Sequence, residues 1–135
     1  MKELTIDAKI ESIEEVTSFV NEQLEAYDCP KKARMQIDIA IDELFSNIAN
    51  YAYASENGQA TVRVEVVKEP LSVLITFIDG GVPYDPLQAS DPDITLCAEE
   101  REEGGLGIYM VKKSMDEITY EYKEGQNILK IKKNL

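Results

Sequence analysis

The sequence predicts a single α+β domain over residues 1–135, and length, composition and periodicity each support this prediction. A chain of 135 residues suits one domain, which buries roughly two thirds of the surface that its unfolded chain exposes. With 44% hydrophobic and 30% charged residues the composition is globular, and no apolar run approaches the ~20 residues of a membrane span. Segments with the two-residue period of strands and segments with the helical period both occur, so we expect an α+β fold.

The first third of the chain is expected to form a short strand and two helices. Apolar residues alternate with polar ones over residues 4–8, which predicts a strand. Ser12 and Glu15 form an S-x-x-E capping box, which predicts the start of the first helix. The buried stripe of that helix consists of Ile13, Val16, Val20, Leu24 and Tyr27. Pro30, which a first helical turn tolerates, indicates that the second helix follows directly.

Residues 37–53 are predicted to form one long central helix with a polar edge. Its apolar stripe consists of Ile37, Ile41, Leu44 and Ile48. Glu43 and Asn47, spaced four residues apart, project together from the border of that stripe. A carboxylate can accept a proton and an amide oxygen suits Mg²⁺, so the pair fits a general base beside a metal ligand. A solvated helix edge explains the same two residues, and the helix alone leaves both interpretations open.

The later segments predict the rest of the sheet. Residues 62–66 alternate as a half-exposed strand, whereas residues 71–78 are almost continuously apolar, which is typical of a strand covered on both faces near the middle of a sheet. The apolar strand ends at Asp79, which fits either an acidic group at a buried strand end or an ordinary turn residue. Residues 118–122 and 128–131 predict a hairpin that completes the sheet.

A long connection, residues 82–103, separates the apolar strand from the last helix. It has no convincing period and contains three prolines, Pro83, Pro86 and Pro92. A structureless connection of this length is unusual in a compact domain, and such loops are typically lids or disordered segments. Its seven acidic residues against one basic residue, Arg101, give it little attraction of its own for an anion.

Four residues then lead into an apolar helical segment at residues 108–115: Gly104, Gly105, Leu106 and Gly107. Glycine backbone amides at a helix N-terminus bind anions readily. A glycine cluster before a helix is nevertheless common, and this one lacks both the Lys-Ser/Thr of a P-loop and the G-x-G-x-x-G spacing of a dinucleotide fold. The cluster therefore supports an anion site and neither of those two folds.

Composition excludes several classes of function. The chain has 26 acidic and 14 basic residues, a net charge of −12 that repels nucleic acid, so we expect no DNA or RNA partner. Histidine is absent, which excludes Ser-His-Asp and Cys-His catalysis and His-ligated zinc. Cys29 and Cys97 fit no C-x-x-C pattern, which favours two reduced thiols and leaves a disulfide open. The first ten residues lack a signal peptide, so a cytoplasmic protein is expected.

Three stretches together resemble a known family: DELFSNIANYAY, FIDGGVPYDP and GGLGIYMVKKSMDEITYE. In this order and spacing they resemble the Bergerat-fold ATPases, which include gyrase, heat-shock chaperone, histidine kinase and mismatch-repair families. Within that group the chain is most similar, over essentially its full length, to the small anti-sigma-factor serine/threonine kinases of bacteria. The resemblance implies a two-layer α/β sandwich, in which helices cover one face of a mixed, mostly antiparallel sheet.

The resemblance also implies a role for individual residues. Glu43 would be the base that activates a serine or threonine hydroxyl, and Asn47 would hold Mg²⁺ that bridges the phosphates of ATP. Asp79 would accept a hydrogen bond from the adenine amino group, and Gly81 would leave room for the base. Backbone amides of a further set of residues would reach the phosphates, namely Gly104, Gly105, Leu106 and Gly107. Residues 82–103 would be the ATP lid, mobile without nucleotide and ordered when Mg-ATP binds.

The chain departs from the family pattern at several positions. Tyr51 stands where many relatives have a histidine, and Pro83 where the second motif often continues to a glycine. Asn127 replaces a usual threonine near adenine and is expected to bind the nucleotide by a hydrogen bond. Glu102 and Glu103 precede the glycines, where relatives have a basic residue.

Two functions from different classes follow from the resemblance. The first is an ATP-dependent protein serine/threonine kinase that phosphorylates an anti-anti-sigma-type antagonist and alternately binds a sigma factor. The alternative is an ATP-binding regulatory module that sequesters its partner without phosphoryl transfer. Relatives are often homodimers, so a homodimer is one expected assembly. A third reading, an α/β domain that binds no nucleotide, is motivated by the acidic lid.

Overall fold

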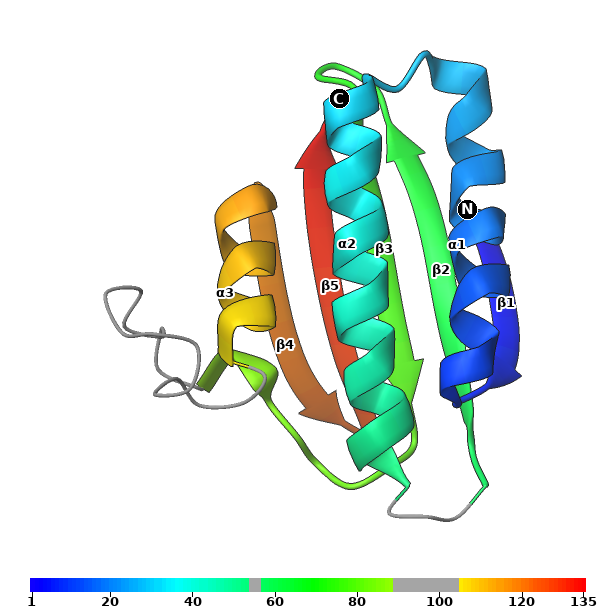
Figure 1. Ribbon diagram of the computed structural model, residues 1–135, viewed down its shortest axis with the longest axis vertical. Coiled ribbons are helices and arrows are strands. Elements are labelled where there is room, and N and C mark those ends of the chain that lie inside the picture. The colour runs from blue at the N-terminus through cyan, green and yellow to red at the C-terminus, as the bar shows by residue number, and fades with distance from the viewer. Residues whose placement is uncertain (54–56, 89–104) are drawn as a thin grey trace.

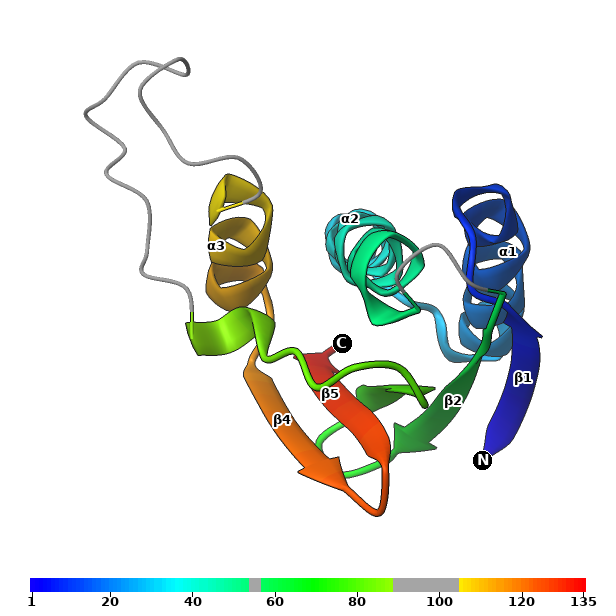
Figure 2. The ribbon, with the colours of Figure 1, turned by 90° about the horizontal axis from the view of Figure 1, so that it is seen from below.

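The computed structural model of the protein has two layers, one of helices and one of strands (Figure 1). The structure describes residues 1–53, 57–88 and 105–135. Within these residues, a five-stranded sheet in the order β1-β2-β3-β5-β4 carries α1, α2 and α3 on one face (Figure 2). The two-layer α+β fold is therefore confirmed.

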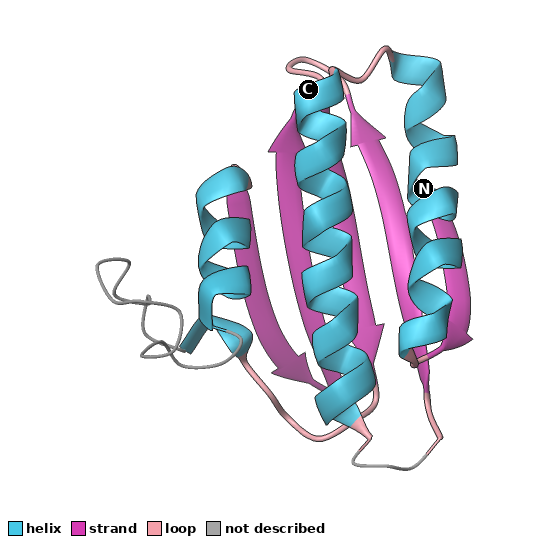
Figure 3. Cartoon of the chain, viewed as in Figure 1, coloured by secondary structure: helices cyan, strands magenta, loops and turns pink. Residues whose placement is uncertain are grey.

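The described elements follow the expected order along the chain. Figure 3 distinguishes the helices from the strands. The strands are β1 (Lys2–Asp7), β2 (Gln59–Val67), β3 (Ser72–Asp79), β4 (Glu117–Lys123) and β5 (Gln126–Asn134). The α-helices are α1 (Ile13–Leu24), α2 (Lys31–Asn47) and α3 (Gly105–Ser114). Short helical turns are η1 (Ile10–Ser12), η2 (Glu25–Tyr27), η3 (Ile48–Ala52) and η4 (Pro86–Gln88). In the described part of the chain, no helix is long and apolar enough to span a membrane.

Every strand pairing among the described residues is antiparallel, whereas the resemblance implies a mixed sheet. β3 and β4, which α3 connects in the chain, both pair antiparallel with β5, which lies between them. These two strands therefore run in the same direction. The parallel relation thus exists between strands that are not neighbours.

The central strand β3 is covered on one face only, which corrects the expectation of two covered faces. Its residues Val73, Ile75 and Phe77 are at most 2% exposed and belong to the core beneath the helices. On the opposite face, which no described helix covers, Leu74 and Thr76 are half-buried, whereas Ser72 and Ile78 at the two ends of the strand are buried. The apolar run reflects cross-strand packing on that open face as well as the core, because Ile78 pairs with Ile128 of β5 there.

The helix α2 is the main element of the helical layer. It begins at Lys31, immediately after Pro30, and buries Ile37 and Ile41 completely. The α-helix ends at Asn47 and continues as the π-helical segment η3, so the predicted single helix over residues 37–53 changes its hydrogen-bond pattern after Asn47. π-helical turns inside helices are often found at functional sites.

The predicted capping box at the start of α1 is wrong. Ser12 makes no side-chain capping hydrogen bond, and its φ of −81° and ψ of −14° are helical instead of extended. A capping residue needs extended backbone geometry so that its side chain can reach the first free amides. Here the turn η1 already coils the chain before Ser12, whose side chain is buried.

The start of the predicted lid is ordered. Val82 donates a backbone hydrogen bond of 2.8 Å to the carbonyl of Ala52 at the end of η3, and Pro86–Gln88 form the turn η4. Residues 89–103 lie outside the described residues, so the prediction that the lid moves concerns residues that the structure does not describe. Gly104 also lies outside the described residues.

Candidate nucleotide site

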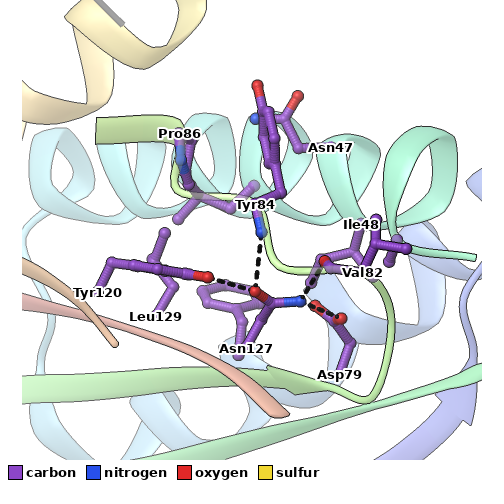
Figure 4. Close-up of a pocket in the computed structure, with 12 residues that line it drawn as sticks. Asn47, Ile48, Asp79, Val82, Tyr84, Pro86, Tyr120, Asn127 and Leu129 are labelled. Atoms are coloured by element: carbon purple, nitrogen blue, oxygen red, sulfur yellow. Dashed lines mark hydrogen bonds between the residues drawn. The ribbon is translucent and has the colours of Figure 1, made fainter. Parts of the chain in front are cut away.

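A pocket opens between the end of α2, the ends of β3 and β5, and the segment that follows β3 (Figure 4). It is lined by Leu44, Asn47, Ile48, Ala52, Phe77, Asp79, Val82, Tyr84, Pro86, Tyr120, Asn127 and Leu129. Leu44, Phe77 and Leu129 are nearly fully buried and make its walls mainly apolar. Such a pocket favours a flat, largely apolar ring that carries a few polar groups.

Asp79 supplies the acidic group of the pocket. It is the last residue of β3 and only 6% exposed, so the strand that was predicted from its apolar run delivers a carboxylate into the interior. Its Oδ1 atom accepts hydrogen bonds from the Gly81 backbone N–H and from Asn127 Nδ2, both at 2.9 Å. Within the described residues no hydrogen bond reaches Oδ2, which leaves this oxygen to accept one from a ligand.

Asn127 of β5 faces Asp79 across the strand pairing and is also 6% exposed. Its side-chain amide donates to Asp79 and to the Val82 carbonyl, the latter at 2.8 Å. Its side-chain oxygen accepts from the Tyr84 backbone N–H at 3.1 Å and from the Tyr120 hydroxyl (Figure 4). Sequence reasoning placed Asn127 near the base and missed the two tyrosines, because their contacts join segments far apart in the chain.

Gly81 is required by a backbone contact. A Cβ atom at this position would lie 2.1 Å from the Ala52 carbonyl oxygen, which is a backbone atom and cannot turn aside. The resemblance attributes this glycine to room for the base. The structure shows a different neighbour, the end of η3, which packs against the exit of β3.

The polar edge of α2 lies next to this pocket. Asn47 lines the pocket, and Glu43, one turn earlier, is half-buried. Partial burial raises the pKa of the Glu43 carboxyl above its ordinary value, and the negative charge of Asp42 raises it further. A carboxylate with a raised pKa binds a proton more readily, which suits a general base.

The beginning of α3 packs against this edge. A Cβ atom on Gly107 would lie 2.2 Å from the carboxyl carbon of Glu43, so the two residues are in direct contact. Gly105 and Leu106 form the first positions of α3. The structure thus brings the first turn of α3 into contact with Glu43, one helical turn before Asn47, which lines the pocket. Their roles stay predictions.

The protein groups at this site fit a metal ion only if phosphate oxygens supply further ligands to it. Among the described residues there is no group of three or more His, Cys, Asp or Glu side chains that could hold a metal. Asn47 offers one amide oxygen beside the pocket. Mg²⁺ commonly keeps several waters and takes few protein ligands plus the phosphates of a substrate, and this site fits that pattern.

Tyr84, which lines the pocket, forms an aromatic pair with the exposed Tyr51. The rings of Tyr51 and Tyr84 have centroids 5.5 Å apart and are tilted by 36°. Burial raises the pKa of the Tyr84 hydroxyl, and Tyr51, Glu43 and Asp85 add to this effect in that order. Both tyrosines lie in the motifs quoted above, yet only the fold reveals their contact.

Comparison with known proteins identifies the family of the chain. The sequence model of the family described as "Histidine kinase-like ATPase domain" matches residues 6–133. The chain is 31% identical over 98 residues to the serine-protein kinase RsbW of Bacillus cereus, a match that covers 70% of this chain and 60% of that protein. It is 24% identical over 98 residues to the serine/threonine-protein kinase BtrW of Bordetella bronchiseptica, covering 73% of this chain and 68% of BtrW.

Two solved structures share the fold. The RsbU and RsbW domains of Rv1364c from Mycobacterium tuberculosis superpose with a TM-score of 0.66 at 17% identity, over 100% of this chain and 33% of that one. The histidine kinase domain of the blue-light activated histidine kinase EL346 from Erythrobacter litoralis gives a TM-score of 0.60 at 16% identity, over 93% of this chain and 60% of that one. At these identities the likeness concerns the fold alone.

Proposed function

The chain belongs to the histidine kinase-like ATPase domain family, and from this premise we propose that it is an ATP-dependent protein serine/threonine kinase. The observation that carries the proposal is the buried carboxylate of Asp79 in an apolar pocket beside Glu43 and Asn47. An acceptor oxygen in an apolar pocket fits the amino group and the flat ring of adenine. The similarity to RsbW and BtrW, both named as serine or serine/threonine kinases, supports the reaction type.

At the phosphate end, the first turn of α3 and the Asn47 amide are the groups that would hold the nucleotide. Backbone N–H groups at a helix N-terminus attract anions, and glycine lets the phosphates approach closely. Asn47 would contribute one oxygen to a Mg²⁺ ion shared with the phosphates, which would neutralise charge near an acidic protein. Together these groups would hold the γ-phosphoryl group near the edge of α2.

Glu43 would act as the general base. The hydroxyl oxygen of a serine or threonine attacks the γ-phosphorus, the bond to the β-phosphate oxygen breaks, and ADP leaves. Glu43 accepts the hydroxyl proton during this step. Its raised pKa keeps it able to take the proton, and its contact with Gly107 supports a role at the phosphate end of the site.

The proposed partner proteins rest on the resemblance to the anti-sigma kinases. We propose an anti-anti-sigma-type antagonist as the phosphorylated protein and a sigma factor as the sequestered one, with the chain acting in the cytoplasm. The support is the resemblance to the anti-sigma kinases together with the two named kinase relatives. A homodimer is the assembly that the resemblance suggests.

The test of this function has two stages. Calorimetry should show binding of ATP in the presence of Mg²⁺, and Asn47→Ala should weaken binding of Mg-ATP more than binding of metal-free ATP. Labelled ATP incubated with the protein and candidate antagonists should then transfer phosphate to serine or threonine. No heat and no thermal stabilisation with Mg-ATP would contradict nucleotide binding. Binding without transfer to any tested antagonist would favour the sequestering module.

A further inference from the structure

Asn127 occupies a buried position between Asp79 and the segment that follows β3. We propose that Asn127 is a positioning residue, which orients the Asp79 carboxylate and holds Val82 and Tyr84 as a wall of the base pocket without giving the nucleotide a polar contact of its own. The identity of the ligand rests on the proposed function. The positioning role rests on the hydrogen bonds of the described residues.

The hydrogen-bonding capacity of Asn127 is already used within the protein. An asparagine side chain has two N–H donors and one oxygen with two acceptor sites. The donors go to Asp79 Oδ1 at 2.9 Å and to the Val82 carbonyl at 2.8 Å. The oxygen accepts from the Tyr84 backbone N–H and from the Tyr120 hydroxyl. No capacity is left for a hydrogen bond to a base.

The surroundings also dictate which way the amide points. The Val82 carbonyl can only accept a hydrogen bond, and the Tyr84 backbone N–H can only donate one. The opposite orientation would place an N–H group against Tyr84 and an oxygen against both Asp79 and Val82. The network therefore has one satisfied arrangement, and a satisfied buried network is rigid.

This arrangement decides what Asp79 can offer a base. Gly81 and Asn127 both donate to Oδ1, which fixes the rotation of the carboxylate and leaves Oδ2 of this pocket-lining residue without a hydrogen bond among the described residues. An acceptor oxygen pairs with the 6-amino group of adenine and repels the 6-oxo group of guanine. Asn127 thereby contributes to purine selection through Asp79 and not through its own contact.

The same side chain holds the opposite wall of the pocket. Val82 and Tyr84 both line the pocket, and both are tied to Asn127 by their backbone atoms. A threonine at this position could donate one hydrogen bond, so it could serve Asp79 or Val82 but not both. Asparagine is therefore suited to fixing the carboxylate and the wall at once.

The experiment separates the orientation of Asp79 from the support of the pocket wall. It compares the variants Asn127→Ala, Asn127→Thr and Tyr120→Phe, with Asn134→Ala as the control on the same strand. Asn134 lies near the far end of β5, where its side chain is exposed. Calorimetry would measure ADP and GDP binding. Hydrogen exchange by NMR would measure protection of the Tyr84 amide in the ligand-free protein.

Asn127→Ala should lower ADP affinity roughly 10- to 100-fold, the usual loss for a hydrogen bond to a charged group, and reduce the preference for ADP over GDP. It should also remove the protection of the Tyr84 amide. Asn127→Thr should recover part of the ADP preference without the amide protection. Tyr120→Phe should have the same effects as Asn127→Ala to a smaller extent. Asn134→Ala should change neither the nucleotide affinities nor the protection of the Tyr84 amide.

The outcomes distinguish this inference from the proposed function. A general loss of folding would lower the affinity for both nucleotides equally, whereas loss of positioning changes their ratio. Unchanged Tyr84 amide protection in Asn127→Ala overturns the inference even if the protein binds no nucleotide. If wild-type protein binds neither nucleotide while the Tyr84 amide loses protection in the variant, the proposed ligand is wrong and the positioning role stands.

Discussion

The base pocket and the polar edge of α2 are built in different ways. The pocket is held by strand pairing, with Asp79 opposite Asn127, and its polar groups are buried and bonded to one another. The edge consists of half-buried side chains, and the start of α3 packs against it at Glu43. The difference teaches that the proposed recognition of the base depends on sheet register, whereas the proposed chemistry depends on how α2 and α3 meet.

The largest expected effect concerns Glu43, on the edge. Glu43→Gln keeps the shape of the side chain and removes the proton acceptor, so phosphoryl transfer should fall roughly 10²- to 10⁴-fold. ATP affinity should change only a few-fold, because the base pocket is untouched. Transfer of labelled phosphate and calorimetry would measure the two quantities. A wild-type transfer rate in this variant would show that Glu43 is not the base.

Gly107→Ala tests the contact between α3 and Glu43. The added Cβ would meet the carboxyl end of a flexible side chain, which can move aside. Stability should therefore stay unchanged or rise by up to about 1 kcal/mol from better helix propensity. A displaced base, however, should slow transfer roughly a hundredfold.

The control for this glycine is Gly80→Ala, whose Cβ would lie 3.7 Å from the Tyr53 hydroxyl, an ordinary contact. The melting temperature and the transfer rate of Gly80→Ala should both stay close to those of the wild type. Equal transfer rates for Gly107→Ala and wild type would mean that the Glu43 position seen here does not matter to the reaction.

Asp79→Asn addresses the pocket with a change of one atom. The new side-chain oxygen can take the place of Oδ1 and keep both Gly81 and Asn127 as donors, so an N–H group would point into the pocket. ADP affinity should fall roughly 10- to 100-fold, and the preference should shift toward GDP, whose 6-oxo group accepts a hydrogen bond. Calorimetry with both nucleotides checks this. An unchanged ADP preference would place the base elsewhere.

Gly81→Ala sharpens the contrast with Gly107. The added Cβ would collide with the Ala52 backbone, which can yield only if η3 moves. We expect a loss of roughly 1–3 kcal/mol in unfolding free energy, as for overpacked sites. Chemical denaturation measures it. We thus expect Gly81→Ala to lower stability, because the pocket is rigid there, and Gly107→Ala to lower only activity, because the Glu43 side chain can adjust. A Gly81→Ala protein as stable as wild type would contradict this difference.

The smallest effect is expected from Asp42, an exposed neighbour of Glu43. The transfer rate requires deprotonated Glu43, so it should fall as pH drops through a pKa above the ordinary 4.5. Asp42→Asn removes the lesser of the two causes that raise this pKa, and the rate profile should move slightly to lower pH. Burial remains, so most of the shift should persist. A profile that moves to higher pH would contradict this assignment.

Several features of the fold and site could be predicted because they depend on local periodicity. The stripe of α2 places Ile37 and Ile41 inside, and the same geometry puts Glu43 and Asn47 together on its edge. The apolar run of β3 correctly indicated a central strand that ends in a buried Asp79. Neighbouring residues in the chain are sufficient for such inferences.

Other features were decided only by the tertiary structure. The open face of β3 depends on which face the helices cover, and the glycine at position 81 depends on the end of η3. The role of Asn127 depends on a register that joins it to Asp79, 48 residues earlier in the chain. A periodic pattern shows which face of an element is apolar, but the atoms that meet a side chain are set by the packing of distant segments.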